Sequence, residues 1–371
     1  MKKVLFVATV VKTHIMEFHL PYLEMFKEMG WKTAVASRND YEDPADCNIP
    51  FCDKFYDIPF ERSPIKPANI TAYKMLKKII DEGEYDIIHC HTPVGAMLAR
   101  LAARKARKKG TRVIYTAHGF HFYSGAPIIN WLLYYPVERF LARYTDVLIT
   151  INQEDFERAR GFKAKKARYV RGVGVDSSRF GGHGQDAASI KQELGLGKEA
   201  FVLLSVGEVN KNKNHRAVIK AMAKLPDKNI YYVVCGQGPL VDEHKALAKE
   251  LGVGERVIFA GYRNDVGRFF CEADAFVFPS FREGLSVALM EAMSCRLPII
   301  CSRIRGNVDL IEDGVTGLTV EPNAQEIANA IKTLYESKEL RERFAAAAGE
   351  KIKSFELDAV KREYRKIYLE D

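Results

Sequence analysis

Residues 275–301 read AFVFPSFREGLSVALMEAMSCRLPIIC, and this stretch decides the fold. It contains a short apolar run at 275–279, a polar loop, a helix-like segment and a second apolar run at 299–301. Two short apolar runs joined through a helix form a βαβ unit, whose two strands are parallel. The stretch therefore predicts an α/β domain in which helices cover a buried parallel sheet.

The same alternation of apolar runs and amphipathic segments continues along the chain and is interrupted once. After Gly172 the sequence GVGVDSSRFGGHGQDAAS is rich in glycine, serine and aspartate and has no periodicity, which is typical of a linker. We therefore predict two doubly wound, Rossmann-like α/β domains that face each other across a cleft. The domains span 1–172 and 196–354, with a linker region at 173–195 and a C-terminal helix at 355–371 that could pack on either domain. Besides the two runs quoted above, strands are predicted at 4–10, 33–37, 87–90, 113–117, 147–151, 201–206, 230–235 and 257–260.

Composition and charge limit the possible functions. The chain has 371 residues, and its apolar fraction of 47% excludes a disordered protein. Residues 1–180 carry 29 Lys+Arg and 20 Asp+Glu, whereas residues 181–371 carry 27 and 28. A basic half joined to a balanced half indicates that one domain faces an anionic surface or substrate. A nucleic-acid function is not favoured, because no motif of a known nucleic-acid-binding module is present.

The apolar runs and the cysteines suggest a cellular compartment. No apolar run approaches the roughly 20 residues that a membrane-spanning helix needs, and residues 1–11 read as a buried strand rather than a secretory signal. The seven cysteines include no pattern typical of a metal site, since Cys47 and Cys52 lack a second pair or a nearby histidine. We expect a cytoplasmic protein with reduced thiols, no cofactor and no bound metal.

Two loops of the second domain could bind a phosphate or approach a ligand closely. After the strand at 201–206, Gly207 and the following lysines lead into a helix, where backbone N–H groups and the helix dipole favour anions. An ordinary strand–helix loop with solvated lysines is an equally good interpretation of this loop alone. The next loop contains Gly236 and Gly238, which allow a close approach of the backbone to a ligand.

The loop after residues 275–279 is the most informative one. Glu283 lies in a turn, Gly284 and Leu285 are predicted to begin a helix, and Glu291 follows eight residues after Glu283. This spacing is about two helical turns, so the two carboxylates could lie on one side of the helix. Carboxylates accept hydrogen bonds from vicinal hydroxyls, and the helix N-terminus attracts anions. The loop therefore favours recognition of a sugar together with a phosphate.

With these residues in place, the whole chain resembles the retaining family 4 glycosyltransferases of the GT-B fold, specifically the bacterial exopolysaccharide and capsule type. Four features carry the resemblance. They are Glu283 and Glu291 within FPSFREGLSVALMEAMSCRLPII, Gly306 followed by EDGVTG at 312–317, the loop SVGEVNKNKNH at 205–215, and the segment YTAHGFHF at 115–122.

The resemblance implies roles for the second domain in binding a nucleotide-sugar donor. Glu291 would hold the ribose hydroxyls, Glu283 the hydroxyls of the transferred sugar, and Lys213 the diphosphate. Where the family usually has an arginine, this chain has Glu208; either Lys211 supplies the second positive charge or the loop is oriented differently. The implied donor-binding set is Gly207, Glu208, Lys211, Lys213, Gly236, Tyr262, Arg263, Glu283, Gly284, Leu285, Ser286 and Glu291, with Tyr262 and Arg263 near the base.

In the first domain the resemblance singles out His118, which would point into the cleft near the transferred sugar. Thr13, His14 and His19 follow the first strand and are expected to help hold the acceptor. His89 and His91 fit a structural role about as well as a functional one.

The implied reaction moves a sugar from a nucleotide-diphosphate sugar, expected to be a UDP-hexose or UDP-HexNAc, to an acceptor with retention at the anomeric carbon. The acceptor would be a saccharide or a polyprenyl-diphosphate-linked saccharide. His118, Glu283 and Lys213 are the candidate catalytic residues, and no metal would be needed. A sugar-nucleotide epimerase, a phosphorylase and a non-catalytic nucleotide-sugar-binding relative remain alternatives.

The basic surplus of the first domain suggests peripheral membrane association. Residues 100–112 carry seven positive charges, and residues 126–143 combine Trp131, Tyr134 and Tyr135 with aliphatic residues. A solvated helix end and a core helix are the ordinary interpretations. A basic patch beside aromatic anchors would also suit the anionic inner face of the cell membrane. The seven positive residues are Arg100, Arg104, Lys105, Arg107, Lys108, Lys109 and Arg112.

Overall fold

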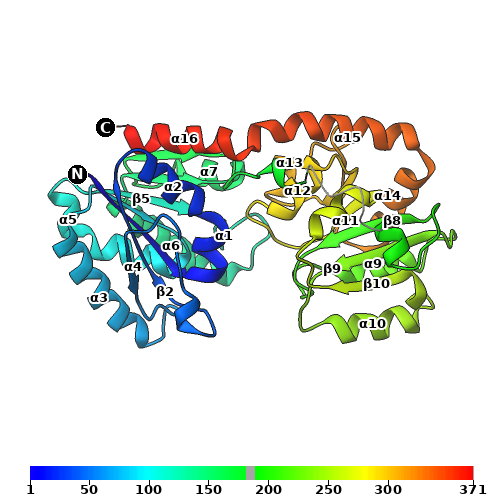
Figure 1. Cartoon of the computed structure of the whole chain (residues 1–371), viewed down its shortest axis with the longest axis horizontal. Coiled ribbons are helices and arrows are strands. Elements are labelled where there is room, and N and C mark those ends of the chain that lie inside the picture. The colour runs from blue at the N-terminus through cyan, green and yellow to red at the C-terminus, as the bar shows by residue number, and fades with distance from the viewer. Residues whose placement is uncertain (181–188, 371) are drawn as a thin grey trace. The chain divides into compact units, whose positions relative to one another are not determined.

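The computed structural model describes residues 1–180 and 189–370. The chain folds into two compact units (Figure 1). Unit 1 comprises Met1–Val173 and Val360–Asp371, and unit 2 comprises Gly174–Ala359. The chain therefore passes from unit 1 to unit 2 after Val173 and returns to unit 1 at Val360.

The predicted linker at 173–195 differs from the structure. Residues 181–188 of this range lie outside the described residues. Val175, however, is buried within unit 2, where its N–H donates to the carbonyl of Phe355 at 3.0 Å and its carbonyl accepts from the N–H of Leu357 at 2.9 Å. The partners of this segment lie about 180 residues further along the chain, so its local composition gave no sign of the pairing.

Unit 1 is built on a seven-stranded parallel sheet with the order β3-β2-β1-β4-β5-β6-β7. The direction of strand addition reverses between β1 and β4, which lie side by side. Ligands of open parallel sheets bind at the carboxyl ends of the strands at such a reversal. The strands are β1 (Lys3–Val10), β2 (Lys32–Arg38), β3 (Lys54–Asp57), β4 (Ile87–Cys90), β5 (Arg112–Ala117), β6 (Val147–Thr150) and β7 (Lys166–Tyr169).

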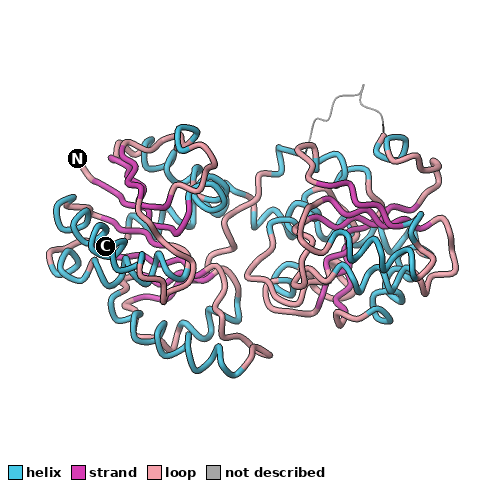
Figure 2. Tube along the Cα trace, turned by 90° about the horizontal axis from the view of Figure 1, so that it is seen from below, coloured by secondary structure: helices cyan, strands magenta, loops and turns pink. Residues whose placement is uncertain are grey.

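Helices cover both faces of this sheet, as Figure 2 shows. Alternate residues of β1 enter opposite cores: Leu5 and Val7 pack with one set of helices, and Val4 and Phe6 with the other. The first core includes residues of α3 (Ala68–Gly83), α4 (Pro93–Ala102), α5 (Arg104–Lys108) and α7 (Gln153–Ala159), with α6 (Ile128–Leu141) packed against it. The second includes residues of α2 (Leu20–Glu28) and α16 (Leu357–Leu369).

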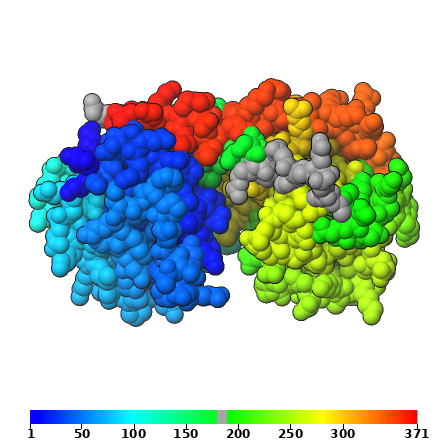
Figure 3. Space-filling view, viewed as in Figure 1, coloured from blue at the N-terminus to red at the C-terminus, as the bar shows by residue number. Residues whose placement is uncertain are grey.

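The C-terminal helix α16 belongs to unit 1 from Val360 onward. Tyr364 and Tyr368 are buried in the second core, and the hydroxyl of Tyr368 lies 2.7 Å from Nδ1 of His89 on β4. Figure 3 shows the C-terminal segment, in red, against the N-terminal residues in blue. Residues of the last helix, α16, thus pack in the same core as residues of the first strand, β1.

Unit 2 repeats the design with a six-stranded parallel sheet in the order β10-β9-β8-β11-β12-β13, which reverses between β8 and β11. One core contains residues of α9 (His215–Met222), α10 (Val241–Glu250) and α14 (Ala324–Glu336). The other contains residues of α11 (Val266–Glu272), α12 (Val287–Ser294), α13 (Asn307–Leu310), α15 (Lys338–Ile352) and the short α8 (Ile190–Glu193). The strands are β8 (Phe201–Val206), β9 (Ile230–Cys235), β10 (Val257–Gly261), β11 (Ala275–Phe278), β12 (Ile299–Ser302) and β13 (Leu318–Val320).

The predicted fold class is confirmed, and each of the ten predicted strands is present. The strands β3, β7 and β13 were missed. All three are edge strands of three or four residues, and β3 and β7 contain no fully buried residue. Because an edge strand is only half covered, its sequence lacks the continuous apolar run that marks a central strand.

Arg100 is not part of the predicted basic surface. Its side chain is fully buried and makes two hydrogen bonds to the carboxylate of Glu138 at 2.8 and 3.1 Å. Its Nε also donates to the carbonyl of Ala96, and its guanidinium lies 4.1 Å from the ring centroid of Tyr115. The charge therefore joins α4 to α6 inside the unit.

Two further members of the predicted basic cluster are also engaged within unit 1. Arg107 makes two hydrogen bonds to Asp146, and Arg112 donates to the carbonyls of Tyr368 and Glu370. The remaining members are exposed on the surface, and they are Arg104, Lys105, Lys108 and Lys109.

The aromatic residues predicted to be interfacial anchors on α6 face inward. Trp131, Tyr134 and Tyr135 pack against the first core. The outward face of α6 is instead aliphatic, with Leu132 68% exposed. Because a helix has 3.6 residues per turn, residues three or four apart share a face, and the aromatic and aliphatic residues of α6 lie on different faces. The other large apolar side chains exposed on α6 are Ile128, Ile129, Leu133, Val137 and Phe140. No helix in the described part of the chain is long and apolar enough to cross a membrane.

Replacing Arg100 by leucine should destabilise unit 1 by about 3–5 kcal/mol, because Glu138 is left without its buried partner. Both tryptophans, Trp31 and Trp131, lie in unit 1, so denaturant unfolding followed by tryptophan fluorescence reports on this unit. The exposed Lys108→Leu is the control and should change the free energy of unfolding by less than about 0.5 kcal/mol. Equal stability of the two variants would contradict a structural role for Arg100.

Candidate functional site

The candidate site of unit 2 is formed by loops at the carboxyl edge of its sheet. The loops that follow β8, β9, β11 and β12 all lie at this edge because the strands are parallel. The strands β8 and β11 adjoin at the reversal of strand order, so the loops 207–214 and 279–286 flank the expected binding crevice.

The loop after β8 packs directly on the loop after β9. The N–H of Gly207 donates to the carbonyl of Cys235, and the N–H of Val209 donates to that of Gln237. A Cβ atom on Gly236 would lie 1.9 Å from the carbonyl oxygen of Gly207. Loop-on-loop packing therefore requires glycine at position 236, whereas the sequence suggested only a close approach to a ligand.

Asparagine side chains join the loop after β8 to the loop after β11. The side-chain amide of Asn212 donates to the carbonyl of Arg282, and the main-chain carbonyl of Asn212 accepts from the N–H of Phe281. Asn214, with a left-handed φ of 54°, donates to the carbonyl of Pro279. The sequence reasoning considered the lysines of this loop and missed the asparagines, although asparagine is enriched at left-handed positions.

Lys213 and Glu283 meet between these two loops. Lys213 Nζ lies 2.8 Å from Glu283 Oε1, with 20% and 14% of the two side chains exposed. The same ammonium group lies 4.5 Å from the ring centroid of Phe278, and Gly207 leaves room beside its stem. A partly buried cation and a partly buried carboxylate, both reachable from solvent, can bind a phosphate and a hydroxyl side by side.

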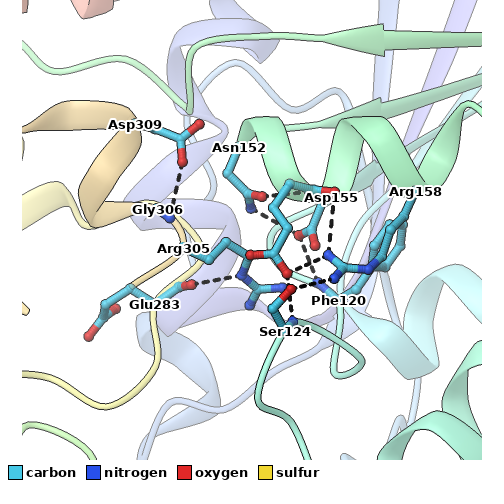
Figure 4. Close-up of polar contacts among 10 residues, drawn as sticks. Phe120, Ser124, Asn152, Asp155, Arg158, Glu283, Arg305, Gly306 and Asp309 are labelled. Atoms are coloured by element: carbon cyan, nitrogen blue, oxygen red, sulfur yellow. Dashed lines mark hydrogen bonds and ion pairs between the residues drawn. The ribbon is translucent and has the colours of Figure 1, made fainter. Parts of the chain in front are cut away.

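Arg305, in the loop after β12, was not identified from the sequence. It is largely buried, and its Nε donates to the main-chain carbonyl of Glu283 at 3.2 Å (Figure 4). Next to it, Gly306 adopts a φ of 82°, and a Cβ atom there would lie 2.4 Å from the carbonyl oxygen of Gly284. The N–H of Gly306 donates to Asp309 at 3.1 Å. This loop therefore supports the backbone at 283–284.

The helix after Glu283 begins later than predicted. Helix α12 starts at Val287, and Ser286 is its N-cap, accepting a hydrogen bond from the N–H of Leu289. Gly284 and Leu285 lie in the preceding bend. Because Glu283 is outside the helix, the two-turn spacing to Glu291 does not place the two carboxylates on one helical face. Glu291 lies in the second turn of α12 and is half-buried.

Glu208 and Lys211, two charged residues of the predicted phosphate loop, are both exposed. Glu208 is exposed and accepts a hydrogen bond from Asn210 at 2.8 Å. Lys211 is exposed at the tip of the loop. Neither Glu208 nor Lys211 contacts the Lys213–Glu283 pair among the described residues. The structure therefore shows no contact by which Lys211 would offset the negative charge of Glu208.

At the position predicted to receive a base, Tyr262 is 72% exposed. Arg263 makes two hydrogen bonds to Asp265 and an ion pair with Glu193. Hydrogen bonding to Arg263, outweighing burial, lowers the pKa of Asp265 to about 2. The guanidinium is therefore already neutralised within unit 2, which leaves Tyr262 as the available group.

In unit 1 the loops after β1, β4 and β5 gather four histidines at the carboxyl edge of the sheet. His14 and His19 come from the π-helical turn η1 (Val11–Ile15) and the residue after α1 (Met16–Phe18), and His91 and His118 follow β4 and β5. His91 Nδ1 lies 3.3 Å from His118 Nε2. His19 is only 2% exposed, so it lies beneath the surface that an acceptor would contact, whereas Thr13 is exposed.

His89 and His91 have different roles, although the sequence did not separate them. Both nitrogens of His89 are paired, with the hydroxyls of Tyr368 and Thr116 at 2.7 and 2.8 Å. His91 joins the cluster with His118 instead. His89 is therefore a satisfied core histidine, and His91 belongs to the candidate site.

The loop that carries His118 is held by the start of α7. Asp155 accepts a hydrogen bond from the N–H of Phe120 at 3.0 Å and another from the amide of Asn152 at 2.9 Å (Figure 4). Asn152 caps the helix by accepting from the N–H of Asp155. These buried contacts fix the backbone two residues after His118.

Comparisons with known proteins agree with this architecture. Residues 3–152 match the family model "Glycosyl transferase 4-like", and residues 186–351 match "Glycosyl transferases group 1". The chain is 42% identical over 345 residues to EpsD of Bacillus subtilis, which is assigned as a glycosyltransferase, covering 91% of this chain and 89% of that protein. It is 31% identical to the Escherichia coli UDP-Gal:alpha-D-GlcNAc-diphosphoundecaprenol alpha-1,3-galactosyltransferase, covering 73% and 70% of the two chains.

Solved structures share the fold at low sequence identity. Anabaena Alr3699/HepE, in complex with UDP and glucose, has a TM-score of 0.81 at 20% identity and covers 99% of both chains. WaaG, a glycosyltransferase involved in lipopolysaccharide biosynthesis, has a TM-score of 0.76 at 18% identity and covers 99% of this chain and 100% of its own.

His215, the first residue of α9, lies buried directly after the loop 207–214. Its Nδ1 is 2.8 Å from the hydroxyl of Tyr232. Burial, with smaller effects of His244 and Lys213, lowers the pKa of His215 to about 3. Between this value and the ordinary pKa of about 6.5, the unfolded chain binds more protons at this position than the folded chain.

The free energy of unfolding of unit 2 should therefore fall as the pH falls below about 6.5. His215→Asn, whose amide can still pair with Tyr232, should reduce this slope by about 1 kcal/mol per pH unit. Denaturant unfolding followed by circular dichroism at about pH 5 and about pH 7 measures the difference. Identical slopes for the variant and the wild type would show that His215 is not buried in its neutral form.

Proposed function

Since the chain belongs to the bacterial family 4 glycosyltransferases and has their GT-B fold, we propose that its donor is a nucleotide-diphosphate sugar bound by unit 2. Family membership makes it a glycosyltransferase of polysaccharide biosynthesis. The observation that carries the donor proposal is the Lys213–Glu283 pair at the strand reversal of unit 2.

The donor is proposed to be a UDP-sugar, either a UDP-hexose or a UDP-HexNAc. The relative from Escherichia coli is named for UDP-Gal, and the structures of HepE contain UDP or UDP-glucose. In this chain Glu291 would accept hydrogen bonds from the ribose hydroxyls, and Glu283 from hydroxyls of the transferred sugar. Tyr262 would lie against the base.

The diphosphate would lie against Lys213 and the N–H groups of residues 284–286, before the first turn of α12. Charge-assisted hydrogen bonds and the helix dipole both favour an anion there. Lys213 would remain between Glu283 and the diphosphate, so one cation would order both parts of the donor. Arg305, which donates to the main-chain carbonyl of Glu283, would be a further positive charge beside the diphosphate, in addition to Lys211.

We propose that the sugar is transferred with retention and without a metal at the diphosphate. The bond from the anomeric carbon to the phosphate oxygen breaks, and its electron pair goes to the diphosphate. The acceptor oxygen attacks from the same face, and its proton passes to the leaving phosphate oxygen. Lys213 and the N–H groups stabilise the charge that develops on the diphosphate. His118 would position the transferred sugar.

Lys213→Met and Glu291→Gln should each weaken binding of the UDP-sugar by at least tenfold, because each removes a charge-assisted hydrogen bond of about 1.5–3 kcal/mol. Thermal-shift screening with UDP-, GDP- and dTDP-sugars identifies the nucleotide, and titration calorimetry then measures the loss. Lys220→Met, at an exposed lysine of α9 outside the donor-binding set, is the matched control and should bind nearly as the wild type does.

Addition of magnesium or manganese to metal-free enzyme should not raise turnover. A strict requirement for either ion would overturn the proposal that protein groups alone neutralise the diphosphate. Survival of donor binding and turnover in both variants would show that the proposed site is wrong. Donor binding without transfer to any acceptor would favour the non-catalytic alternative, and bound pyridoxal phosphate would favour a phosphorylase.

The acceptor is proposed to be a saccharide linked to a polyprenyl diphosphate, presented at the inner face of the cell membrane. The Escherichia coli relative is named for such an acceptor. In unit 1 a hollow of about 650 Å³ is lined by seven basic side chains and by Tyr144, whose ring lies 5.7 Å from that of Phe140 at the end of the exposed apolar face of α6. Apolar insertion beside basic groups suits an anionic leaflet. The basic side chains of the hollow are Lys77, Arg104, Lys105, Arg107, Lys108, Arg143 and Lys165.

Leu132→Glu combined with Leu133→Glu should release the protein from anionic vesicles, because the charges prevent apolar insertion. Liposome flotation with and without anionic lipid measures the binding. Ile65→Glu replaces an even more exposed apolar residue elsewhere in unit 1 and should leave flotation unchanged. Equal binding of the wild type to neutral vesicles, or no binding to either kind, would contradict the electrostatic part of the proposal.

A further inference from the structure

The four histidines of unit 1 form a compact group of potential ligands. His14, His19, His91 and His118 each offer a ring nitrogen, and these four atoms all lie within 4.8 Å of one another. The residues come from the loops after β1, β4 and β5, at the reversal of strand order. The sequence gave no sign of the group, because its members are separated by 5, 72 and 27 positions and match no short metal-binding motif.

Several nitrogens of this group are buried without a hydrogen-bond partner. They are Nε2 of His14, both ring nitrogens of His19, and Nε2 of His91. Buried polar atoms in proteins are almost always paired, and each unpaired one lowers stability. By contrast, His89 lies against the same group and has both nitrogens paired with hydroxyls. Three of the four histidines of the cluster therefore carry at least one buried ring nitrogen that has no hydrogen-bond partner among the described residues.

The ring arrangement fits tetrahedral coordination. A zinc ion with imidazole ligands at about 2.0 Å separates the ring centroids by about 5 Å. His14 lies 5.0 Å from both His19 and His118, and His91 lies 5.5 Å from His118. The His14–His91 and His19–His118 separations are both 5.9 Å. Only the His19–His91 separation, 3.8 Å, must widen for all four rings to bind one ion.

We propose that His14, His19, His91 and His118 bind one divalent transition-metal ion of the zinc class. Nitrogen ligands select zinc and its neighbours over magnesium, which prefers oxygen. His14 and His118 are only partly buried, so the ion can enter the group from solvent, and with four nitrogen ligands it would be closed to substrate, as in structural zinc sites. This inference amends the expectation that the chain binds no metal, and it gives His118 a metal-binding role in place of a contact with the transferred sugar, whereas the donor groups of unit 2 keep their proposed roles.

Zinc binding to untagged, chelator-treated protein tests the proposal. Equilibrium dialysis followed by elemental analysis should find one zinc ion per chain, and cobalt should bind with the intense visible bands of tetrahedral coordination. His14→Ala and His91→Ala should each weaken zinc binding by at least tenfold. His121→Ala, which removes a histidine stacked on Tyr134 outside the cluster, should bind zinc as the wild type does.

Tryptophan fluorescence shows whether each variant is folded, because both tryptophans lie in unit 1. If His91→Ala unfolds, the partly exposed His14→Ala carries the test. Absence of zinc from the wild type, unchanged zinc affinity in folded His14→Ala, or binding of inorganic phosphate in place of zinc would overturn the proposal. The measurement uses no donor, so its failure is distinguishable from failure of the UDP-sugar site in unit 2.

Discussion

Parallel pairing of the strands is the constraint on which the rest of the structure depends. In both sheets every strand runs in the same direction, so every strand–helix loop lies at one edge. The strand order reverses once in each unit, between β1 and β4 and between β8 and β11. At each reversal two adjacent loops diverge to opposite faces of the sheet. The side chains that could bind a ligand or take part in a reaction are found on these loops.

The two units use the same edge for different chemistry. In unit 2, Lys213 and Glu283 form a charged pair supported by backbone contacts from Asn212, Arg305 and Gly306. In unit 1, the corresponding loops carry a cluster of four histidines, two of them buried and two partly buried. The basic surplus of the first half lies away from that cluster. Part of it is internal, as with Arg100, and part lines the hollow near the end of α6, as with Arg107.

Much of the fold was predictable from sequence, because central parallel strands are buried on both faces and appear as apolar runs. The edge strands β3, β7 and β13 could not be read in this way. In the site, the sequence identified Lys213 and Glu283, and the structure brings them together. The predicted start of α12 at Gly284 and Leu285 is too early. The helix begins after Ser286, a residue type favoured at N-caps, and this signal was overlooked in the sequence.

The sequence by itself determined the fold class, the two-part organisation and the family, since these depend on periodicity and on motifs within short stretches. Only the tertiary structure decided which charged and polar groups are partners. Lys213 and Glu283 are 70 residues apart, Arg100 and Glu138 are 38 apart, and Val175 pairs with a segment about 180 residues away. Such contacts are made when helices and loops pack on a sheet, and local sequence carries no record of which residues that packing brings together.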